Sequence, residues 1–215
     1  MQRANAIIFD ADGTIFNSFG LIVQAYSHIS ETYGVAMPEE DEIKAKMGKP
    51  LGEMLKYFFP NIDVAMLMDT NHSFVSSNVS KATLYPGMKP LLKEMYYRGV
   101  KLGVLTNGNK TIERIIAYYN LTKYFSSIVH ADRINFHKPE PNGVYLVCKE
   151  AGVSTSETVV VGDSIDDIEA GKRASVLATI LIDHGLLSSD DIQKSNPDYI
   201  VTSTNELRKI VRLLT

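Results

Sequence analysis

Short apolar runs rich in β-branched residues alternate with helical patterns from about residue 84 to the end of the chain. This alternation predicts an α/β fold, a Rossmann-like three-layer core with a parallel central sheet between two layers of helices. Most of the runs are apolar on both faces, as expected of parallel strands that lie between helices. Predicted strands span residues 6–8, 101–105, 127–130, 158–162, 178–182 and 199–201, and predicted helices span residues 88–98, 111–119, 140–151, 166–174 and 204–214.

The segment of residues 17–82 departs from this alternation. It contains helical patterns at residues 21–33 and 51–59 and no convincing strand between them. We therefore expect a Rossmann-like core made of residues 1–16 and 83–215, and a small all-helical cap made of residues 17–82. An insertion directly after the first strand lies over the carboxyl edge of the sheet, which is the position of a lid. The methionines and aromatic residues expected to form the core of this cap are Met47, Met54, Tyr57, Phe58, Phe59, Met66 and Met68.

The composition excludes several classes of protein. The chain has 215 residues, of which 45% are hydrophobic, so it can bury a sizeable core. Its net charge is −3, with Lys and Arg scattered along the chain, which argues against nucleic-acid binding. Cys148 is the only cysteine, so no intramolecular disulfide can form, and we expect a buried structural thiol. The first residues do not resemble a signal peptide and no apolar stretch is long enough to span a bilayer, so we expect a soluble cytoplasmic protein with no membrane partner.

Two carboxylates directly follow the first predicted strand. Asp10 and Asp12 lie at positions i and i+2 of a turn that contains Gly13. With a period of two, both side chains lie on the same side of an extended backbone, at the sheet edge where open α/β proteins bind ligands. Two acids held this close repel each other, and a hard divalent cation such as Mg²⁺, which prefers oxygen ligands, relieves the repulsion. Taken alone, an ordinary Asp-rich turn explains this motif equally well.

Two weaker signals follow later in the chain. Thr106, Asn107 and Gly108 come after the second core strand, where a hydroxyl and free backbone amides before a helix could hold an anion. Lys138 precedes Pro139, and its ammonium could hold both a phosphate oxygen and a carboxylate. Taken singly, the first signal is more often an ordinary turn and the second a solvated surface lysine.

A second acidic pair follows the Val-rich predicted strand at residues 158–162. Asp163 and Asp167 are spaced i, i+4 as a helix begins, so Asp163 could reach a cation directly and Asp167 could be an outer or water-mediated partner. Asp166 points to another face, where an acid stabilises a helix N-terminus. N-capping explains one of these acids but not a pair at a strand end. In chain order, the four motifs supply an acid pair, a hydroxyl, a lysine and a second acid pair.

This order resembles the four motifs of the haloacid dehalogenase superfamily. Asp10-x-Asp12-Gly13-Thr14 is similar to its first motif, Thr106-Asn107-Gly108 to its second, Lys138-Pro139 to its third, and Gly162-Asp163-Ser164-x-x-Asp167 to its fourth. The resemblance spans the chain. The helical insertion is similar to the small cap of the subfamily that contains phosphoglycolate phosphatase and β-phosphoglucomutase.

The resemblance implies a role for each motif residue. Asp10 would attack phosphorus and form an aspartyl-phosphate, and Asp12 would protonate the leaving group and then take a proton from water. Mg²⁺ would be held by Asp10, the main-chain carbonyl of Asp12, and Asp163. Lys138 would neutralise further charge, and Asp167 would be an outer partner. The residues implied in phosphate or substrate binding are Gly13, Thr106, Asn107, Gly108, Lys138 and Lys49.

Comparison with the family pattern narrows the expected reaction. The second acid, Asp12, favours phosphate ester chemistry over dehalogenation or phosphonate cleavage. Mutases similar to β-phosphoglucomutase usually carry a histidine where this chain has Ile22 and a glutamate where it has Gly162, so the resemblance favours a hydrolase. We therefore expect a Mg²⁺-dependent phosphomonoester hydrolase, similar to phosphoglycolate phosphatase, that acts on a small phosphorylated metabolite. We expect it to be a monomer or weak dimer.

Three alternatives stay open at this point. They are a phosphosugar mutase similar to β-phosphoglucomutase, a 5′-nucleotidase, and a non-enzymatic phospho-receiver or regulatory protein. The substrate is also open between phosphoglycolate, sugar phosphates and nucleoside monophosphates. Lys49, in the cap loop of residues 47–51, is the candidate for contact with an anionic substrate tail, against the alternative of a solvated lysine.

Overall fold

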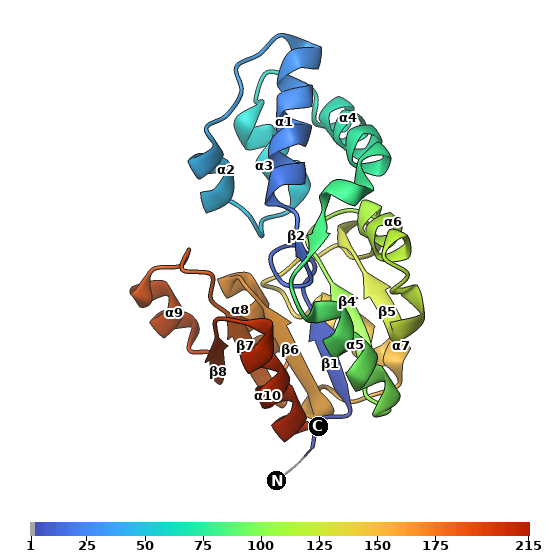
Figure 1. The fold of residues 1–215 in the computed structure, drawn as a ribbon. Helices are drawn as coiled ribbons and strands as arrows, with labels where there is room; N and C mark the ends of the chain where they lie inside the picture. The colour runs from blue at the N-terminus through green and yellow to red at the C-terminus, as the bar shows by residue number, and fades with distance from the viewer. Residues whose placement is uncertain (1–2) are drawn as a thin grey trace.

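The computed structural model describes residues 3–215 and contains a six-stranded parallel sheet in the order β5-β4-β1-β6-β7-β8 (Figure 1). The strands are β1 (Ala6–Phe9), β4 (Lys101–Leu105), β5 (Phe125–Val129), β6 (Thr158–Gly162), β7 (Ala178–Ile182) and β8 (Tyr199–Val201). The predicted α/β fold with a parallel sheet is confirmed. Because all six strands run in one direction, their carboxyl ends meet at a single edge.

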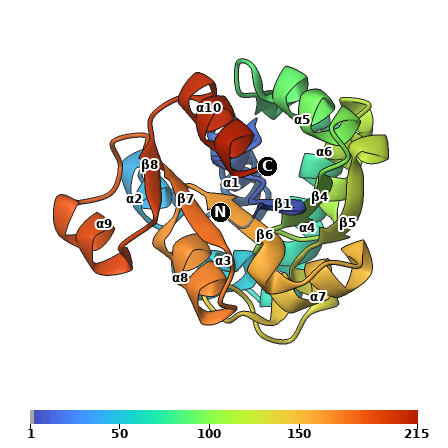
Figure 2. The same ribbon diagram turned by 90° about the horizontal axis from the view of Figure 1, so that it is seen from below.

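Alternate residues of β1 supply the apolar clusters on the two faces of the sheet. Ile7 and Phe9 belong to the cluster on one face, whereas Ile8 belongs to the cluster on the other. The first cluster contains side chains of α5 (Met88–Tyr97), α6 (Thr111–Tyr118) and α10 (Thr204–Leu214), and the second those of α7 (Asn142–Ala151) and α8 (Ile165–Arg173). Figure 2 shows α5 and α10 on one side of the sheet and α7 and α8 on the other. Burial on both faces explains why the strands read as continuous apolar runs.

The core helices lie close to their predicted positions, with one addition. The unpredicted helix α9 (Ser189–Ser195) is short and polar, and the Ser188 side chain caps it by accepting a hydrogen bond from Asp191 N at 3.1 Å. Short 3₁₀ helices span Val79–Lys81, Thr122–Tyr124, Ala131–Arg133 and Thr155–Glu157. Cys148 is buried against the sheet on α7, as expected of a structural thiol.

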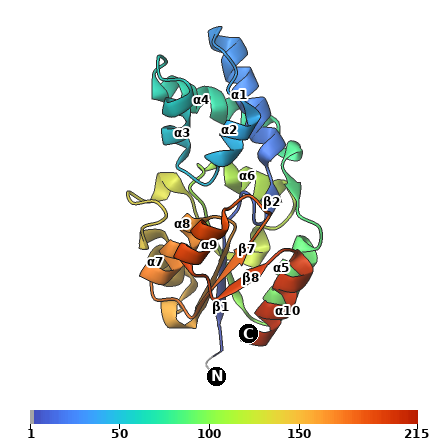
Figure 3. The same cartoon turned by 90° about the vertical axis from the view of Figure 1, so that its left-hand side faces the viewer.

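Four helices form an insert above the carboxyl edge of the sheet (Figure 3). They are α1 (Phe19–Tyr33), α2 (Glu40–Ala45), α3 (Leu51–Phe58) and α4 (Val64–Ser77), and they are called the cap below. An antiparallel pair, β2 (Phe16–Asn17) and β3 (Thr83–Leu84), carries the chain into and out of the cap. The predicted boundaries at residues 16/17 and 82/83 fall at this pair, and the division into two domains stays a prediction.

The cap has an apolar cluster of its own, but not every side chain expected there belongs to it. Met54 and Phe59 are buried in this cluster, and Phe58 and Met68 pack against it. The prediction is wrong for Tyr57 and Met66, which are both 53% exposed. In place of a core position, the Tyr57 hydroxyl donates to Glu42 Oε1 at 2.8 Å on the cap surface. Met47 lines a cavity that is described below.

No helix between residues 3 and 215 combines the length and the apolar character that a membrane crossing requires.

Candidate active site

Three neighbouring strands bring the sequence motifs to one place. Asp10 follows β1, Thr106 follows β4, and Asp163 follows β6. β1 lies between β4 and β6 in the sheet, so these strand ends are adjacent. Residues separated by more than 50 positions in the chain thus meet at the carboxyl edge, below the cap (Figure 1).

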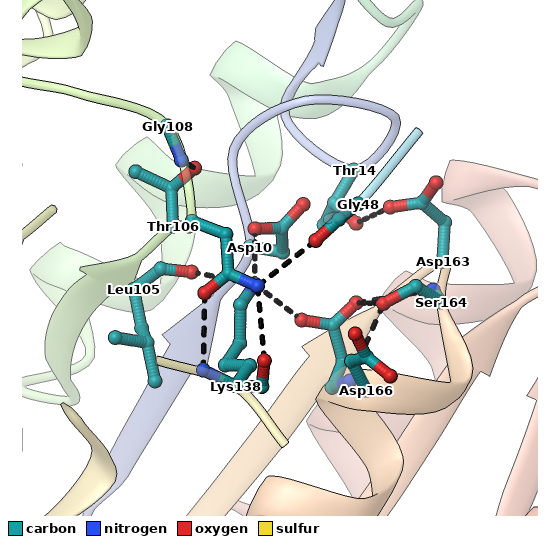
Figure 4. A network of polar contacts seen from close by, with 12 residues as sticks. Asp10, Thr14, Gly48, Leu105, Thr106, Gly108, Lys138, Asp163, Ser164 and Asp166 are labelled. Atoms are coloured by element: carbon teal, nitrogen blue, oxygen red, sulfur yellow. Dashed lines mark hydrogen bonds and ion pairs between the residues drawn. The ribbon is translucent and has the colours of Figure 1, made fainter. Parts of the chain in front are cut away.

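The Lys138 ammonium lies at the centre of this group (Figure 4). Its Nζ lies 2.5 Å from Asp10 Oδ1 and 2.5 Å from Asp167 Oδ1, and it donates to the Leu105 carbonyl at 3.1 Å. The Lys138 side chain is only 4% exposed, so the alternative of a solvated surface lysine is wrong. Burial lowers the pKa of this lysine, but the Asp10 and Asp167 carboxylates outweigh burial and raise the pKa above its ordinary value. Lys138 therefore stays protonated.

The Asn107 side chain fixes the backbone of this lysine. Its Oδ1 accepts a hydrogen bond from Lys138 N at 3.0 Å, and its Nδ2 donates to the Lys138 carbonyl at 3.1 Å. The same Nδ2 donates to the Gly48 carbonyl of the cap loop at 2.9 Å. One amide side chain therefore links the second and third motifs and also joins the core to the cap. The sequence indicated only its backbone amide.

Three carboxylates form a candidate cation site. Oxygen atoms of Asp10, Asp163 and Asp167 lie within 4.8 Å of one another. Burial raises the pKa of Asp10 well above its ordinary range and that of Asp163 to about 7, and the neighbouring Asp167 adds to both effects. One lysine does not balance three acids, and an all-oxygen donor set suits a hard divalent cation, so these residues fit the cation that the sequence predicts.

The composition of this acidic group differs in detail from the prediction. Asp167, expected as an outer partner, lies within it, although its Oδ1 faces Lys138 and its Oδ2 accepts from Ser164 Oγ at 2.6 Å. The Asp12 side chain is not among the three carboxylates. The resemblance implied that Asp12 binds Mg²⁺ through its main-chain carbonyl and not through its side chain. Which of these residues bind the metal stays a prediction.

The first motif wraps closely around Asp163. Gly13 has a φ of +87°, and a Cβ at this position would lie 2.0 Å from Asp163 Oδ2, so both conformation and space require glycine. Thr14 Oγ1 donates to Asp163 Oδ1 at 2.9 Å. His184 Nε2 lies 2.7 Å from the Gly13 carbonyl, and its ring stacks on Tyr85. The sequence assigned no role to His184, which supports the motif turn from the loop after β7.

The second motif faces Asp12. Gly108 N donates to Thr106 Oγ1 at 3.0 Å, so the threonine hydroxyl and the glycine amide are held together in one turn. Asp12 Oδ2 lies opposite this turn, 3.5 Å from where a Cβ on Gly108 would be. Burial raises the pKa of Asp12 above its ordinary value, which favours a protonated carboxyl group. The expected role of Asp12 as a general acid requires a protonated carboxyl group at this place.

The two acids that begin α8 have different partners. Ser164 and Asp167 form a capping box, in which Asp167 N donates to Ser164 Oγ at 3.3 Å and Ser164 N donates to Asp167 Oδ2 at 3.0 Å. Asp166, also in the first helical turn, pairs with Lys49 of the cap loop at 2.7 Å. The lysine expected to meet an anionic substrate tail is therefore already paired with an acid.

A cavity of about 120 Å³, called the cap–core cavity, lies between the cap and the sheet edge. The predicted site residues that line it are Asp10, Asp12, Lys49, Thr106, Asn107 and Gly108. Gly13 and Asp163 line an adjacent hollow, and Lys138 lies behind Asp10. The structure thus brings together the residues of all four motifs, while their roles stay predictions.

Comparison with known proteins places this arrangement in a family. The family model described as "Haloacid dehalogenase-like hydrolase" matches residues 7–180, which include all four motifs. A pyrophosphatase PpaX of Halalkalibacterium halodurans is 28% identical over 214 residues, covering 98% of each chain. A phosphoglycolate phosphatase of Vibrio parahaemolyticus is 25% identical over 225 residues, covering 98% of this chain and 97% of the relative. The crystal structure of a predicted phosphoglycolate phosphatase from Haemophilus somnus 129pt has the same fold, with a TM-score of 0.86 and 22% identity, covering 98% of this chain and 99% of that one.

Proposed function

Because the chain belongs to the haloacid dehalogenase-like hydrolase family, we propose that it is a Mg²⁺-dependent phosphomonoester hydrolase that forms an aspartyl-phosphate at Asp10. The family and the hydrolase class expected from the motifs are confirmed; the metal, the site roles and the substrate, a small phosphorylated metabolite, belong to the proposal. The observation that carries it is the buried Lys138 ammonium, 2.5 Å from both Asp10 and Asp167, directly behind the Asp10 carboxylate that lines the cap–core cavity. A cation at this point lets a carboxylate approach a phosphate dianion.

The first half of the reaction transfers the phosphoryl group to the protein. An Asp10 carboxylate oxygen forms a bond to phosphorus as the ester P–O bond breaks. The departing oxygen takes a proton from Asp12, whose pKa is raised above its ordinary value by burial. Thr106 Oγ1 and the Gly108 amide, which bond to each other in this structure, turn toward the phosphoryl oxygens.

The second half returns Asp10 to its carboxylate form. Asp12 takes a proton from a water molecule, the water oxygen bonds to phosphorus, and the bond between phosphorus and Asp10 breaks to release inorganic phosphate. Mg²⁺ held by Asp10, Asp163 and the Asp12 main-chain carbonyl would supply further neutralisation of phosphate charge. In the resting protein Lys138 is protonated, because its two carboxylate partners, Asp10 and Asp167, hold its pKa high.

Local packing supports hydrolysis over phosphosugar transfer. A Cβ on Gly162 would lie 2.2 Å from Asp167 Cγ, so the glutamate usual in mutases does not fit here unless Asp167 moves. Ile22, at the position where those mutases usually carry histidine, lines the cavity with an apolar side chain. Cytoplasmic location and a monomeric or weakly dimeric state stay predictions from the sequence.

The proposal is tested by phosphate release from p-nitrophenyl phosphate and a panel of phosphorylated metabolites, with Mg²⁺ or with EDTA. We expect release that requires Mg²⁺ and is lost in Asp10→Asn. Asp41→Asn, on the exposed surface of α2, is the matched control and should retain activity. No release from any ester by folded, Mg²⁺-loaded protein would contradict the proposal.

A further inference from the structure

The end of the cap–core cavity away from the phosphate site is mostly apolar. Its walls there come from α1, α3, α4 and α6, with Leu21, Ile22, Met54, Val75, Ile112 and Ile115 among the lining residues. The cavity volume of about 120 Å³ corresponds to roughly ten water-sized groups. Because this volume also includes the phosphate site, the apolar end has room for a small organic leaving group.

This end of the cavity also lacks free positive charge. Among the described residues that line the cavity, Lys49 is the one cation, and its Nζ pairs with Asp166 Oδ2 at 2.7 Å. Lys138 is not among the lining residues; it lies behind Asp10 and pairs with Asp10 and Asp167. A second anionic group on a substrate would therefore be removed from water without a counter-charge, which is costly.

Polar groups are nevertheless present in the walls. Tyr26 lines the cavity, is fully buried, and its hydroxyl has no hydrogen-bond partner. Burial raises the pKa of this phenol, so the hydroxyl stays neutral and keeps its proton. Asn71, 5% exposed, also lines the cavity from α4. A buried hydroxyl without a partner is costly, and a polar group of a bound ligand would satisfy it.

We propose that the cap–core cavity selects phosphate monoesters whose leaving group is uncharged, presents an apolar face and carries a hydrogen-bonding group. This inference rests on the proposed phosphatase function and specifies its substrate class. The proposed substrates differ from those in the names of the relatives. The leaving group of pyrophosphate is phosphate and that of phosphoglycolate is glycolate, and both are anions. Ile22, Tyr26 and the paired Lys49 are the residues that determine the preference.

The test compares two esters of the same shape, 4-carbamoylphenyl phosphate and 4-carboxyphenyl phosphate, which differ in one negative charge. We expect kcat/KM at least about tenfold higher for the carbamoyl ester, the cost of one poorly compensated charge. For pyrophosphate and phosphoglycolate, kcat/KM should also be lower than for the carbamoyl ester. Equal rates, or a preference for the carboxylated ester, would overturn the inference and leave the phosphatase function intact.

Two variants of Ile22 test the cavity wall directly. Ile22→Lys adds a cation on α1, and the preference for the carbamoyl ester should fall at least about fivefold, whereas Ile22→Met, of similar length without charge, should keep it. If Ile22→Lys does not fold, Asp166→Asn frees the charge of Lys49 and should shift the preference in the same direction. An unchanged preference in every folded variant would overturn the inference.

Tyr26→Phe tests the hydrogen-bonding part of the inference. Loss of the hydroxyl should raise KM for the carbamoyl ester a few-fold and leave phenyl phosphate, which has no distal polar group, unchanged. Equal effects on both esters would show a packing role only and overturn this part. If the wild-type protein releases no phosphate from either ester or from p-nitrophenyl phosphate, the phosphatase function itself is contradicted.

Discussion

The two ends of the cap–core cavity differ in charge and in the elements that form them. The core end lies beside Asp10, Asp163 and Asp167 and the buried Lys138; each of the three acids follows a core strand or begins a core helix. The cap end is built mainly from apolar side chains on helices, with a single lysine at its edge already paired. In the proposed function, the core end breaks the phosphate ester and the cap end selects the leaving group.

The largest expected effect comes from the nucleophile at the core end. Asp10→Asn keeps the size and most of the packing but removes the attacking carboxylate, so kcat should fall at least about a thousandfold for every ester. The charge preference of the cap end cannot be measured in this variant, but substrate binding can. Steady-state phosphate release and equilibrium binding of the carbamoyl ester check the prediction, and retention of wild-type kcat would refute it.

The next effect concerns the lysine that joins the acids. Lys138→Met leaves Asp10 and Asp167 buried without their cation, so we expect a loss of about 3–5 kcal/mol in the free energy of unfolding. Activity should fall about a hundredfold or more, because phosphate charge is no longer neutralised. Denaturant unfolding measures the first effect. Lys149→Met, on the exposed side of α7, is the control and should change the free energy of unfolding by no more than about 0.5 kcal/mol.

A smaller effect is the dependence of stability on pH in metal-free protein. Burial raises the pKa of Asp163 from 3.8 to about 7, so between these pH values the unfolded chain has lost a proton that the folded protein keeps. The free energy of unfolding should therefore fall as the pH rises from about 4 to about 7, then level off. Asp163→Asn should remove this part of the slope. Unfolding in EDTA at several pH values checks the difference, and parallel pH curves for the two proteins would contradict it.

The smallest effect lies at the rim of the cap end. Asp166→Asn removes the partner of Lys49, a side chain that is 54% exposed, and should raise kcat/KM for 4-carboxyphenyl phosphate only a few-fold. The carbamoyl ester should be unaffected. The ratio of the two specificity constants at low and high salt measures this effect, which should weaken as salt screens the freed charge. A loss of activity toward both esters would show that the ion pair is needed to hold the cap loop.

The difference between the core strands and the cap helices also explains which features could be predicted from the sequence. The strands of the core were predictable because burial on both faces leaves apolar runs, and their ends could be located because Asp10, Thr106 and Asp163 follow those runs directly. The cap was predicted less completely. α2, α4 and the outward position of Tyr57 were missed. α2 has only six residues, and polar residues interrupt the apolar pattern of the 14-residue α4, so both leave a weak periodic signal.

Contacts between distant segments had no sequence signal. The pairing of Lys49 with Asp166, and of Asn107 with both Lys138 and Gly48, depends on how the cap lies on the sheet. The same applies to His184, whose contact with Gly13 spans 171 positions in the chain. A local pattern carries no information about such neighbours, so these residues become visible only in the folded structure.

The most direct test of the account is to trap the covalent intermediate. Wild-type protein turning over p-nitrophenyl phosphate with Mg²⁺ is quenched in acid, digested and analysed by mass spectrometry. We expect a phosphoryl group on the peptide that contains Asp10, and none in Asp10→Asn treated in the same way. A phosphoryl group on another residue, or a protein that releases phosphate without any trapped intermediate at Asp10, would contradict the account.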